Sequence, residues 1–174
     1  MTKRLLLIDT TFDDTALESF KNYIDPSNFF LLVDLSDVEF CMLQLSGIPA
    51  ETYDSVGIVA QGHNSAIWGQ SLLDDGFAQL LKSRCKTSVD VSSTLEIDIF
   101  AWSMLYSDLV LQVFSSNLGL GVRVNFTSTA RAYNWELENT IQQGKRVLAP
   151  SVRNLQNLYL GAQDVLARSS AFKF

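Results

Sequence analysis

Three kinds of side chain in this sequence could carry chemistry: a single histidine, a serine that follows an apolar run, and two cysteines. The histidine, His63, comes after the apolar run Ile58–Ala60 and the pair Gln61-Gly62. In α/β proteins ligands bind beyond the carboxyl ends of the strands, so this placement suits a functional group. His63 could act as a general base or as a ligand, or it could be an ordinary loop residue.

The candidate nucleophiles do not complete a known catalytic pattern. Ser103 stands where a strand gives way to a helix, but its neighbours are not the glycines of a GxSxG turn. Cys85 falls late in a helix expected at Trp68–Arg84, at the end opposite His63, which makes a cysteine–histidine pair geometrically poor. With no CxxC pair present, we expect Cys41 and Cys85 to be buried, reduced thiols.

Metal and nucleotide sites are not predicted, and we expect no cofactor. A single histidine leaves carboxylates as the remaining ligands, and no group of them has calcium-loop spacing. The pair Asp74-Asp75 is expected on the solvated face of a helix, and Glu136 and Glu138 would diverge on a helix because they are two residues apart. No GxGxxG or GxxxxGK[ST] motif occurs, so neither type of nucleotide site is indicated.

The elements that must position these residues are visible as alternating strands and helices. Apolar runs, mostly without polar alternation, predict buried strands at Arg4–Ile8, Phe29–Asp34, Val56–Ala60, Leu95–Ala101, Gly121–Phe126 and Arg146–Ala149. Helical patterns run from a capping box at Thr15 to Asp25-Pro26, and over Trp68–Leu81, Leu105–Phe114 and Leu155–Leu166. Residues Val38–Leu45 could form a helix or a strand. This alternation of strand and helix continues to the C-terminus. It predicts an α/β fold with three layers, α-β-α, in which the central layer is a mainly parallel sheet of about six strands.

This topology brings two loops to one edge of the sheet. The loops after the third and fourth predicted strands share the carboxyl edge, where such sheets bind their ligands. The candidates for a pocket are therefore Gln61, Gly62, His63, Trp102 and Ser103.

Composition limits the class of protein. The 174 residues are 47% hydrophobic and 11% aromatic, which suits one globular domain with a substantial core. A net charge of −6, with scattered basic residues, does not favour binding to nucleic-acid phosphates. The apolar stretch near the N-terminus is too short for a signal peptide, and no run approaches the ~20 apolar residues of a membrane span. We expect a chain that is cytoplasmic or incorporated in a protein particle, with no nucleic-acid partner.

Two stretches of the sequence, "YDSVGIVAQGHNSAIWGQSLL" and "DIFAWSM" at Asp98–Met104, carry a resemblance to a known family. They resemble segments of caspase-like domains, a clan of cysteine proteases with a histidine–cysteine dyad. The first is similar to the family's strand that ends in Ser-His-Gly, and the second stands where a later strand ends in Gly-Cys. "LLLIDTTFDD" resembles the family's opening strand, and "NWELE" at Asn134–Glu138 resembles a late Trp-x-Leu-Glu stretch. The resemblance covers roughly Leu5–Leu148. It is closest to a bacterial domain of unknown function at the head of large repeat-containing surface proteins.

The resemblance implies a site that has lost its catalytic dyad. The family's histidine position falls on Gln61 and its cysteine position on Met104, while Gly62 is retained and Ser103 replaces the oxyanion-hole glycine. Glutamine takes up no proton at neutral pH, and a thioether cannot become a thiolate. By the same resemblance, residues 1–150 are expected to form a single caspase-like domain. The helical pattern after Pro150 predicts that residues 151–174 form a helix and tail packed on this domain or on a partner.

The predicted function is therefore that of a catalytically inactive caspase-like domain. It would serve as a structural or protein-interaction subunit of a larger assembly, such as a virion or another protein shell. Aromatic side chains are favoured contacts in protein interfaces, and the candidates are Tyr133, Trp135, Phe172 and Phe174. Two alternatives stay open: a hydrolase with a rearranged site that uses His63 with Ser103 or Cys85, and a small-molecule binding module at the same edge.

Overall fold

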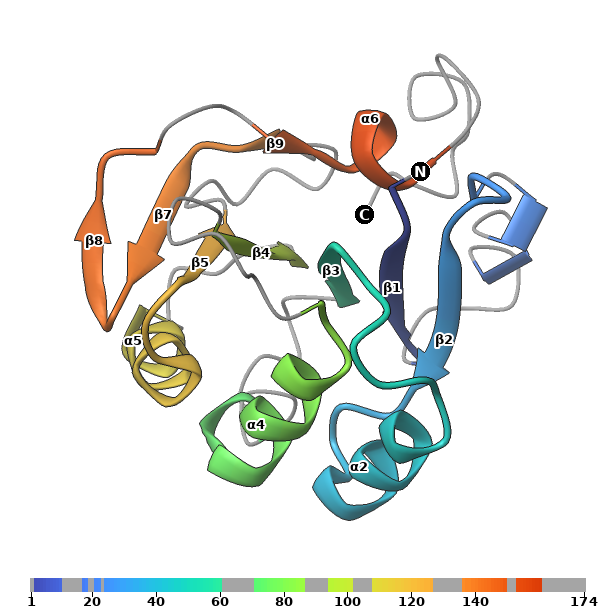
Figure 1. Ribbon diagram of the computed structural model, residues 1–174, viewed down its shortest axis with the longest axis horizontal. Helices are drawn as coiled ribbons and strands as arrows, with labels where there is room; N and C mark the ends of the chain where they lie inside the picture. Colours follow the sequence, from blue (N-terminus) through green and yellow to red (C-terminus); the bar gives the residue numbers. More distant parts are fainter. Residues whose placement is uncertain are drawn as a thin grey trace.

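The chain folds around a seven-stranded sheet in which β1 to β5 run parallel (Figure 1). The computed structural model describes residues 2–10, 17–18, 21–22, 24–60, 71–86, 94–101, 108–126, 136–149 and 153–160. The strand order is β2-β1-β3-β4-β5-β7-β8, and a separate ribbon pairs β6 with β9. The strands are β1 (Arg4–Asp9), β2 (Phe29–Val33), β3 (Ser55–Ala60), β4 (Leu95–Ala101), β5 (Val122–Phe126), β6 (Glu136–Leu137), β7 (Asn139–Gln142), β8 (Lys145–Val147) and β9 (Arg153–Asn154). The predicted α/β fold with a mainly parallel sheet is confirmed, with seven strands in place of about six.

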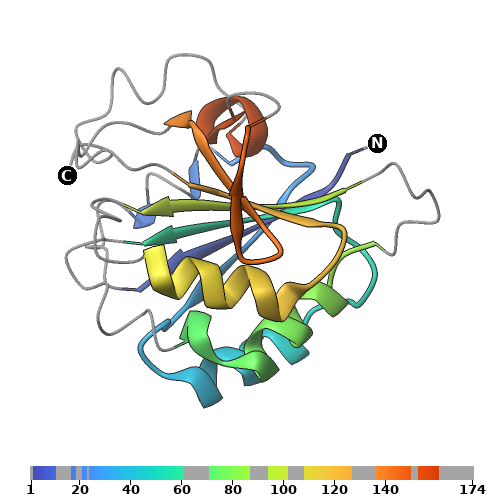
Figure 2. The same ribbon diagram turned by 90° about the vertical axis from the view of Figure 1, so that its left-hand side faces the viewer.

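Helices lie on both faces of this sheet (Figure 2). Three of them share one face: α2 (Val38–Ser46), α4 (Asp75–Ser83) and α5 (Asp108–Leu118). The connections from β2 to β3, from β3 to β4 and from β4 to β5 all move across the sheet in the same direction. Because crossovers between parallel strands are right-handed, the helices in these connections lie on the same face. The connection from β1 to β2 steps the other way, and its residue Leu17 accordingly packs on the opposite face. That face also carries α6 (Leu155–Tyr159) and the β6–β9 ribbon.

The two faces of the sheet differ in polarity. Alternate residues such as Leu5, Ile58 and Ile97 point to the face of α2, α4 and α5, which is apolar over most of the length of the strands and carries the buried Asp9 at the end of β1. On the α6 face, Ile8 and Phe100 form an apolar core at the carboxyl-terminal half of the strands. The amino-terminal half of the α6 face carries charged and polar side chains, and these form the main polar site described below.

After β5, the structure differs from the predicted alternation of strand and helix. Strand β7 runs antiparallel to both β5 and β8. A two-residue turn, Gln143-Gly144, joins β7 to β8, and both of its residues have positive φ angles, 53° and 76°. Such turns favour Asn-Gly or Asp-Gly, so Gln-Gly is a weak signal in the sequence. Glu136 lies in β6 and Glu138 in the connection to β7, so neither lies on a helix.

The helix predictions need smaller corrections. The ambiguous segment Val38–Leu45 is helical in α2, with Asp37 as its N-cap. Asp74 does not lie inside a helix, because it is the N-cap of α4 and accepts a backbone hydrogen bond from the first turn. Ile24, expected on the first helix, instead forms an isolated antiparallel bridge with Leu160.

Candidate functional site

The pocket predicted at the carboxyl edge of the sheet lies outside the described residues. This holds for the pocket and dyad positions and for the aromatic contact candidates: Gln61, Gly62, His63, Trp102, Ser103, Met104, Tyr133, Trp135, Phe172 and Phe174. The structure does place the strands that lead to two of these loops. β3 and β4 are parallel neighbours, and Ala60 at the end of β3 pairs with Ala101 at the end of β4. The two loops therefore start from the same edge, as predicted, and the pocket itself stays a prediction.

Both cysteines are buried and unpaired, as expected. Burial raises the pKa of the Cys41 thiol to about 12, and the nearby carboxylates of Asp9, Asp34 and Asp37 add to this shift. Burial likewise raises the pKa of Cys85 to about 12, with a smaller contribution from Asp54. Because the thiolate is the nucleophilic form, neither thiol is activated at neutral pH.

Cys85 also lies far from the carboxyl edge of the sheet. It follows α4, which ends at Ser83, and it forms an isolated parallel bridge with Tyr53, just before β3 begins. From Tyr53 to Ala60 the chain spans roughly 20 Å at the usual rise of an extended strand. Cys85 is therefore at the amino-terminal edge, opposite the end of β3 at Ala60.

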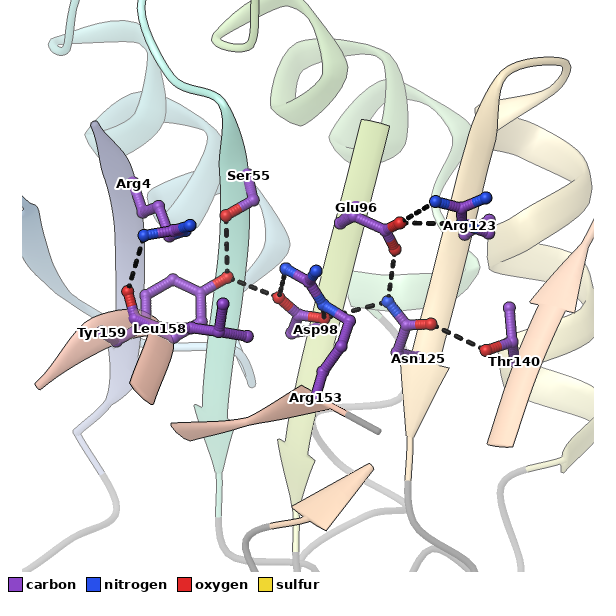
Figure 3. Close-up of polar contacts among 10 residues, drawn as sticks. All are labelled: Arg4, Ser55, Glu96, Asp98, Arg123, Asn125, Thr140, Arg153, Leu158 and Tyr159. Atoms are coloured by element: carbon purple, nitrogen blue, oxygen red, sulfur yellow. Dashed lines mark hydrogen bonds and ion pairs between the residues drawn. The ribbon is translucent and has the colours of Figure 1, made fainter. Parts of the chain in front are cut away.

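A polar cluster crosses the α6 face of the sheet, and we call it the Asp98 network (Figure 3). It comprises eight residues: Ser55, Glu96, Asp98, Arg123, Asn125, Thr140, Arg153 and Tyr159. The strand register explains why the sheet residues meet. Ser55, Glu96 and Arg123 stand in one row across β3, β4 and β5, and Asp98, Asn125 and Thr140 stand in another across β4, β5 and β7.

Asp98 is the centre of this network and is fully buried. Arg153 binds it through two nitrogens, with Nε 2.7 Å from Oδ1 and Nη2 2.9 Å from Oδ2. The Tyr159 hydroxyl donates to Oδ2 at 2.7 Å, and the Asn125 amide donates to Oδ1 at 2.9 Å. Four hydrogen bonds use the acceptor capacity of the carboxylate, and the guanidinium compensates its charge.

The second half of the network extends along β5. Arg123 Nε donates to Glu96 Oε1 at 2.7 Å, and a second guanidinium nitrogen binds the same oxygen. Asn125 joins the two halves, because its amide nitrogen lies 2.7 Å from Glu96 Oε2 and 2.9 Å from Asp98 Oδ1. Its amide oxygen accepts from the Thr140 hydroxyl at 2.8 Å. Asn125 on β5 thus donates to both carboxylates, in addition to the contacts of Arg123 with Glu96 and those of Arg153 and Tyr159 with Asp98.

Tyr159 reaches the network through a space that a glycine leaves open. Gly57 pairs with Leu6 on one side and with Asp98 on the other, so its position lies in the middle of the sheet. A Cβ atom at Gly57 would lie 2.8 Å from Tyr159 Cζ and 2.9 Å from Leu6 Cδ1. The absence of a side chain at Gly57 therefore allows the Tyr159 ring to lie against the sheet, where its hydroxyl contacts Ser55 Oγ at 3.2 Å.

The protonation states of Tyr159 and Arg153 are fixed near neutral pH. Burial raises the pKa of Tyr159 well above its usual value, and the Asp98 carboxylate raises it further. Burial tends to lower the pKa of Arg153, but its hydrogen bonds and charge interaction with Asp98 outweigh this effect and raise it. Tyr159 thus stays neutral and Arg153 stays charged, so neither residue is suited to proton transfer at neutral pH.

The arrangement anchors the C-terminal part of the described chain to the sheet. Besides the contacts of Arg153 and Tyr159 with Asp98, Arg4 Nη1 donates to the Leu158 carbonyl at 3.2 Å. The Asn28 amide nitrogen donates to the carbonyls of Leu158 and Tyr159 at 3.3 and 3.2 Å. The network is therefore a structural clamp between the sheet and residues Arg153–Leu160.

Sequence reasoning did not identify this clamp. One signal was available, since β4 reads Leu-Glu-Ile-Asp-Ile, which alternates and puts Glu96 and Asp98 on one face. The partner Arg153 stands 55 positions later, and no local pattern connects it to Asp98.

Two further searches of the structure give negative results for the parts of the chain it describes. Those residues contain no group of three or more histidine, cysteine, aspartate or glutamate side chains arranged to hold a metal ion. Among the same residues, no helix is long and apolar enough to cross a membrane.

Comparison with known proteins identified no relative of this chain. No family model matches the chain, and no similar protein was found among curated proteins or solved structures. The resemblance to caspase-like domains therefore stays a prediction from the sequence motifs.

Proposed function

We propose that this chain is a non-catalytic α/β domain that acts as a structural or protein-interaction subunit of a larger assembly. The observation that carries the proposal is the apolar character of α2 on both of its sides. Cys41 and Leu45 are buried on the inner side, whereas Phe40 and Leu43 on the outer side are 49% and 68% exposed. Phe40 and Leu43 are three residues apart and lie on one side of the helix, so the outer side of α2 suits a contact with another protein.

The energy available from such a contact is useful but limited. Burying a large apolar side chain contributes about 1.5 to 3 kcal/mol, and Phe40 and Leu43 are already partly buried. Covering the remaining surface would therefore contribute about 1 to 2 kcal/mol for each residue. These two residues would be anchors within a larger interface.

Three features support the non-catalytic part of the proposal. The carboxylates of Glu96 and Asp98 are engaged in the clamp, and the thiols of Cys41 and Cys85 are buried and protonated at neutral pH. The sequence resemblance adds a third feature, since the positions of the caspase-like dyad hold Gln61 and Met104. A caspase-like origin with a lost active site is part of this proposal.

The proposal is tested on protein isolated from its natural source under gentle conditions. Mass photometry should find the chain in discrete complexes larger than a single copy, and mass spectrometry should identify the other members. In parallel, fluorophosphonate and iodoacetamide probes should label the native protein no more than the His63→Ala and Ser103→Ala variants. A solitary monomer whose native-state labelling is lost in either variant would overturn the proposal in favour of a hydrolase.

A further inference from the structure

The outer side of α2 combines exposed apolar residues with negative charge. Phe40 and Leu43 are exposed there, and the exposed carboxylates of Asp37 and Glu39 lie at the beginning of the same helix. The chain on either side of α2 carries no basic residue, because no lysine or arginine occurs in the sequence between Lys21 and Lys82. A basic residue that approaches α2, Arg84, donates to the Ile48 carbonyl beyond the other end of the helix. We call the surface formed by Asp37, Glu39, Phe40 and Leu43 the α2 face.

A second exposed surface has the opposite charge. Strand β8 is the last strand of the sheet, and its residues Lys145, Arg146 and Val147 are all exposed. Leu148, which follows the strand, is 95% exposed, and Val147 is 40% exposed. We call the strand edge formed by Lys145, Arg146, Val147 and Leu148 the β8 edge. Lys145 and Val147 lie on one side of the strand, and Arg146 on the other side lies over the Phe126 ring and donates to Asn139 Oδ1 at 3.4 Å.

These two surfaces lie at opposite ends of the molecule (Figure 1). The helix α2 connects β2 to β3 and therefore lies under the end of the sheet formed by β2 and β1. The β8 edge is separated from that end by β3, β4, β5 and β7. One molecule therefore cannot bring its own two surfaces together, but two copies can.

The charges favour contact between unlike surfaces. Two α2 faces in contact would bring Asp37 and Glu39 of both copies together, and two β8 edges would do the same with Lys145 and Arg146. Like charges in contact oppose association, and basic residues on an edge strand also discourage pairing between edges. The α2 face against the β8 edge brings opposite charges together around two pairs of apolar residues.

We propose that copies of this chain associate head to tail, with the β8 edge of one copy docked on the α2 face of the next. The interface joins different surfaces of the two copies, so each added copy leaves one free surface of each kind. Such interfaces generate rings when the rotation closes and filaments when it does not. This inference rests on the proposed function, because it names a second copy of the chain as the interaction partner.

The test uses the purified full chain and variants of each surface, studied by sedimentation velocity over a range of concentrations. The wild-type protein should form oligomers that grow with concentration and weaken as salt is added. Phe40→Ser with Leu43→Ser removes the apolar part of the α2 face, and Val147→Ser with Leu148→Ser does the same at the β8 edge. Each double variant should weaken association about 30-fold or more and sediment as a monomer. As a matched control, Leu109→Ser changes a residue on α5 that is 70% exposed and should leave the oligomers unchanged.

Mixing the two double variants gives the sharpest result. Each variant keeps one intact surface, so an equimolar mixture should form dimers that contain one copy of each and should grow no further. Continued assembly of either variant alone, or a mixture that stays monomeric, would overturn the head-to-tail arrangement. Circular dichroism and thermal melting establish that the variants are folded.

Charge variants provide an independent version of the test if a serine variant does not fold. Glu39→Lys and Lys145→Glu should each weaken association several-fold at low salt, and mixing these two variants should restore a contact in which both charges are exchanged. No recovery on mixing would count against the arrangement.

The failure of this inference and the failure of the proposed function give different results. If the purified chain is monomeric at every concentration, the head-to-tail arrangement is wrong. If the same chain is nevertheless isolated from its source in a complex with other proteins, the proposed function stands.

Discussion

Breaking the buried pair of Asp98 and Arg153 should destabilise the protein far more than breaking an exposed pair. Asp98→Asn leaves the Arg153 guanidinium, whose side chain is only 17% exposed, without its counter-charge. Arg153→Met removes the two hydrogen bonds that the guanidinium donates to the fully buried Asp98 carboxylate. Removing one member of a buried ion pair costs about 3 to 5 kcal/mol, a large part of the 5 to 15 kcal/mol that a typical domain has.

The double variant with both changes should cost less than the sum of the single changes. It leaves neither charge uncompensated, and the new amide still offers an oxygen to Tyr159 or Asn125. We expect a loss of about 1 to 3 kcal/mol for the double variant and a coupling energy of about 3 kcal/mol or more. The assay is urea unfolding followed by circular dichroism, with the free energy of unfolding extrapolated to zero urea.

A matched surface pair supplies the control for this cycle. Lys86 Nζ lies 3.1 Å from Asp54 Oδ1, and the two side chains are 50% and 34% exposed. Lys86→Met should therefore cost less than about 1 kcal/mol. The clamp would be refuted if the single changes at Asp98 and Arg153 also lowered the free energy of unfolding by less than about 1 kcal/mol. It would also be refuted if the loss in the double variant equalled the sum of the two single losses.

Three further predictions concern groups buried on the two faces of the sheet. The folded state keeps protons on Cys41, Cys85 and Tyr159 that the unfolded chain releases at alkaline pH, since burial raises the pKa of both thiols to about 12 and that of Tyr159 above its usual value. The free energy of unfolding should therefore fall as pH rises above about 9, and Tyr159→Phe should reduce the part of this fall above about pH 10; a flat profile would contradict this. Gly57→Ala should lower the stability measured by thermal unfolding by about 1 to 3 kcal/mol, because its Cβ would collide with Tyr159. Gly47→Ala is the control: its Cβ would lie 3.4 Å from the nearest atom, so it should change stability by no more than about 0.5 kcal/mol. An aromatic disulfide reagent should modify neither cysteine in the native protein and both in guanidinium, and rapid native labelling would show that the thiols are accessible.

The sequence was informative about the parallel strands because β1, β3, β4 and β5 are buried over most of their length. β4 was predicted with its observed bounds, Leu95–Ala101, and the predicted start of β1 at Arg4 is also confirmed. The same reasoning missed the hairpin of β7 and β8, since the turn residues Gln143-Gly144 do not have the composition that usually marks such a turn.

The clamp was harder to predict than the fold because it depends on residues far apart in the chain. Its members come from β3, β4, β5 and β7 and from the segment that begins at Arg153. Periodicity shows which residues share a face of a strand, but it does not show which distant segment covers that face. The alternation of Glu96 and Asp98 indicated a polar stripe on β4, and Gly57 had no evident role until Tyr159 was placed over it.

The most direct test of the function is the state of the protein in its natural source when the α2 face is changed. The chain with Phe40→Ser and Leu43→Ser is expressed there in place of the wild type, released gently and measured by mass photometry beside the wild-type and Leu109→Ser proteins. We predict that the wild-type and Leu109→Ser chains are found in complexes and that the α2-face variant is found as a folded monomer. A folded α2-face variant that enters the same complexes in the same amount would contradict the account.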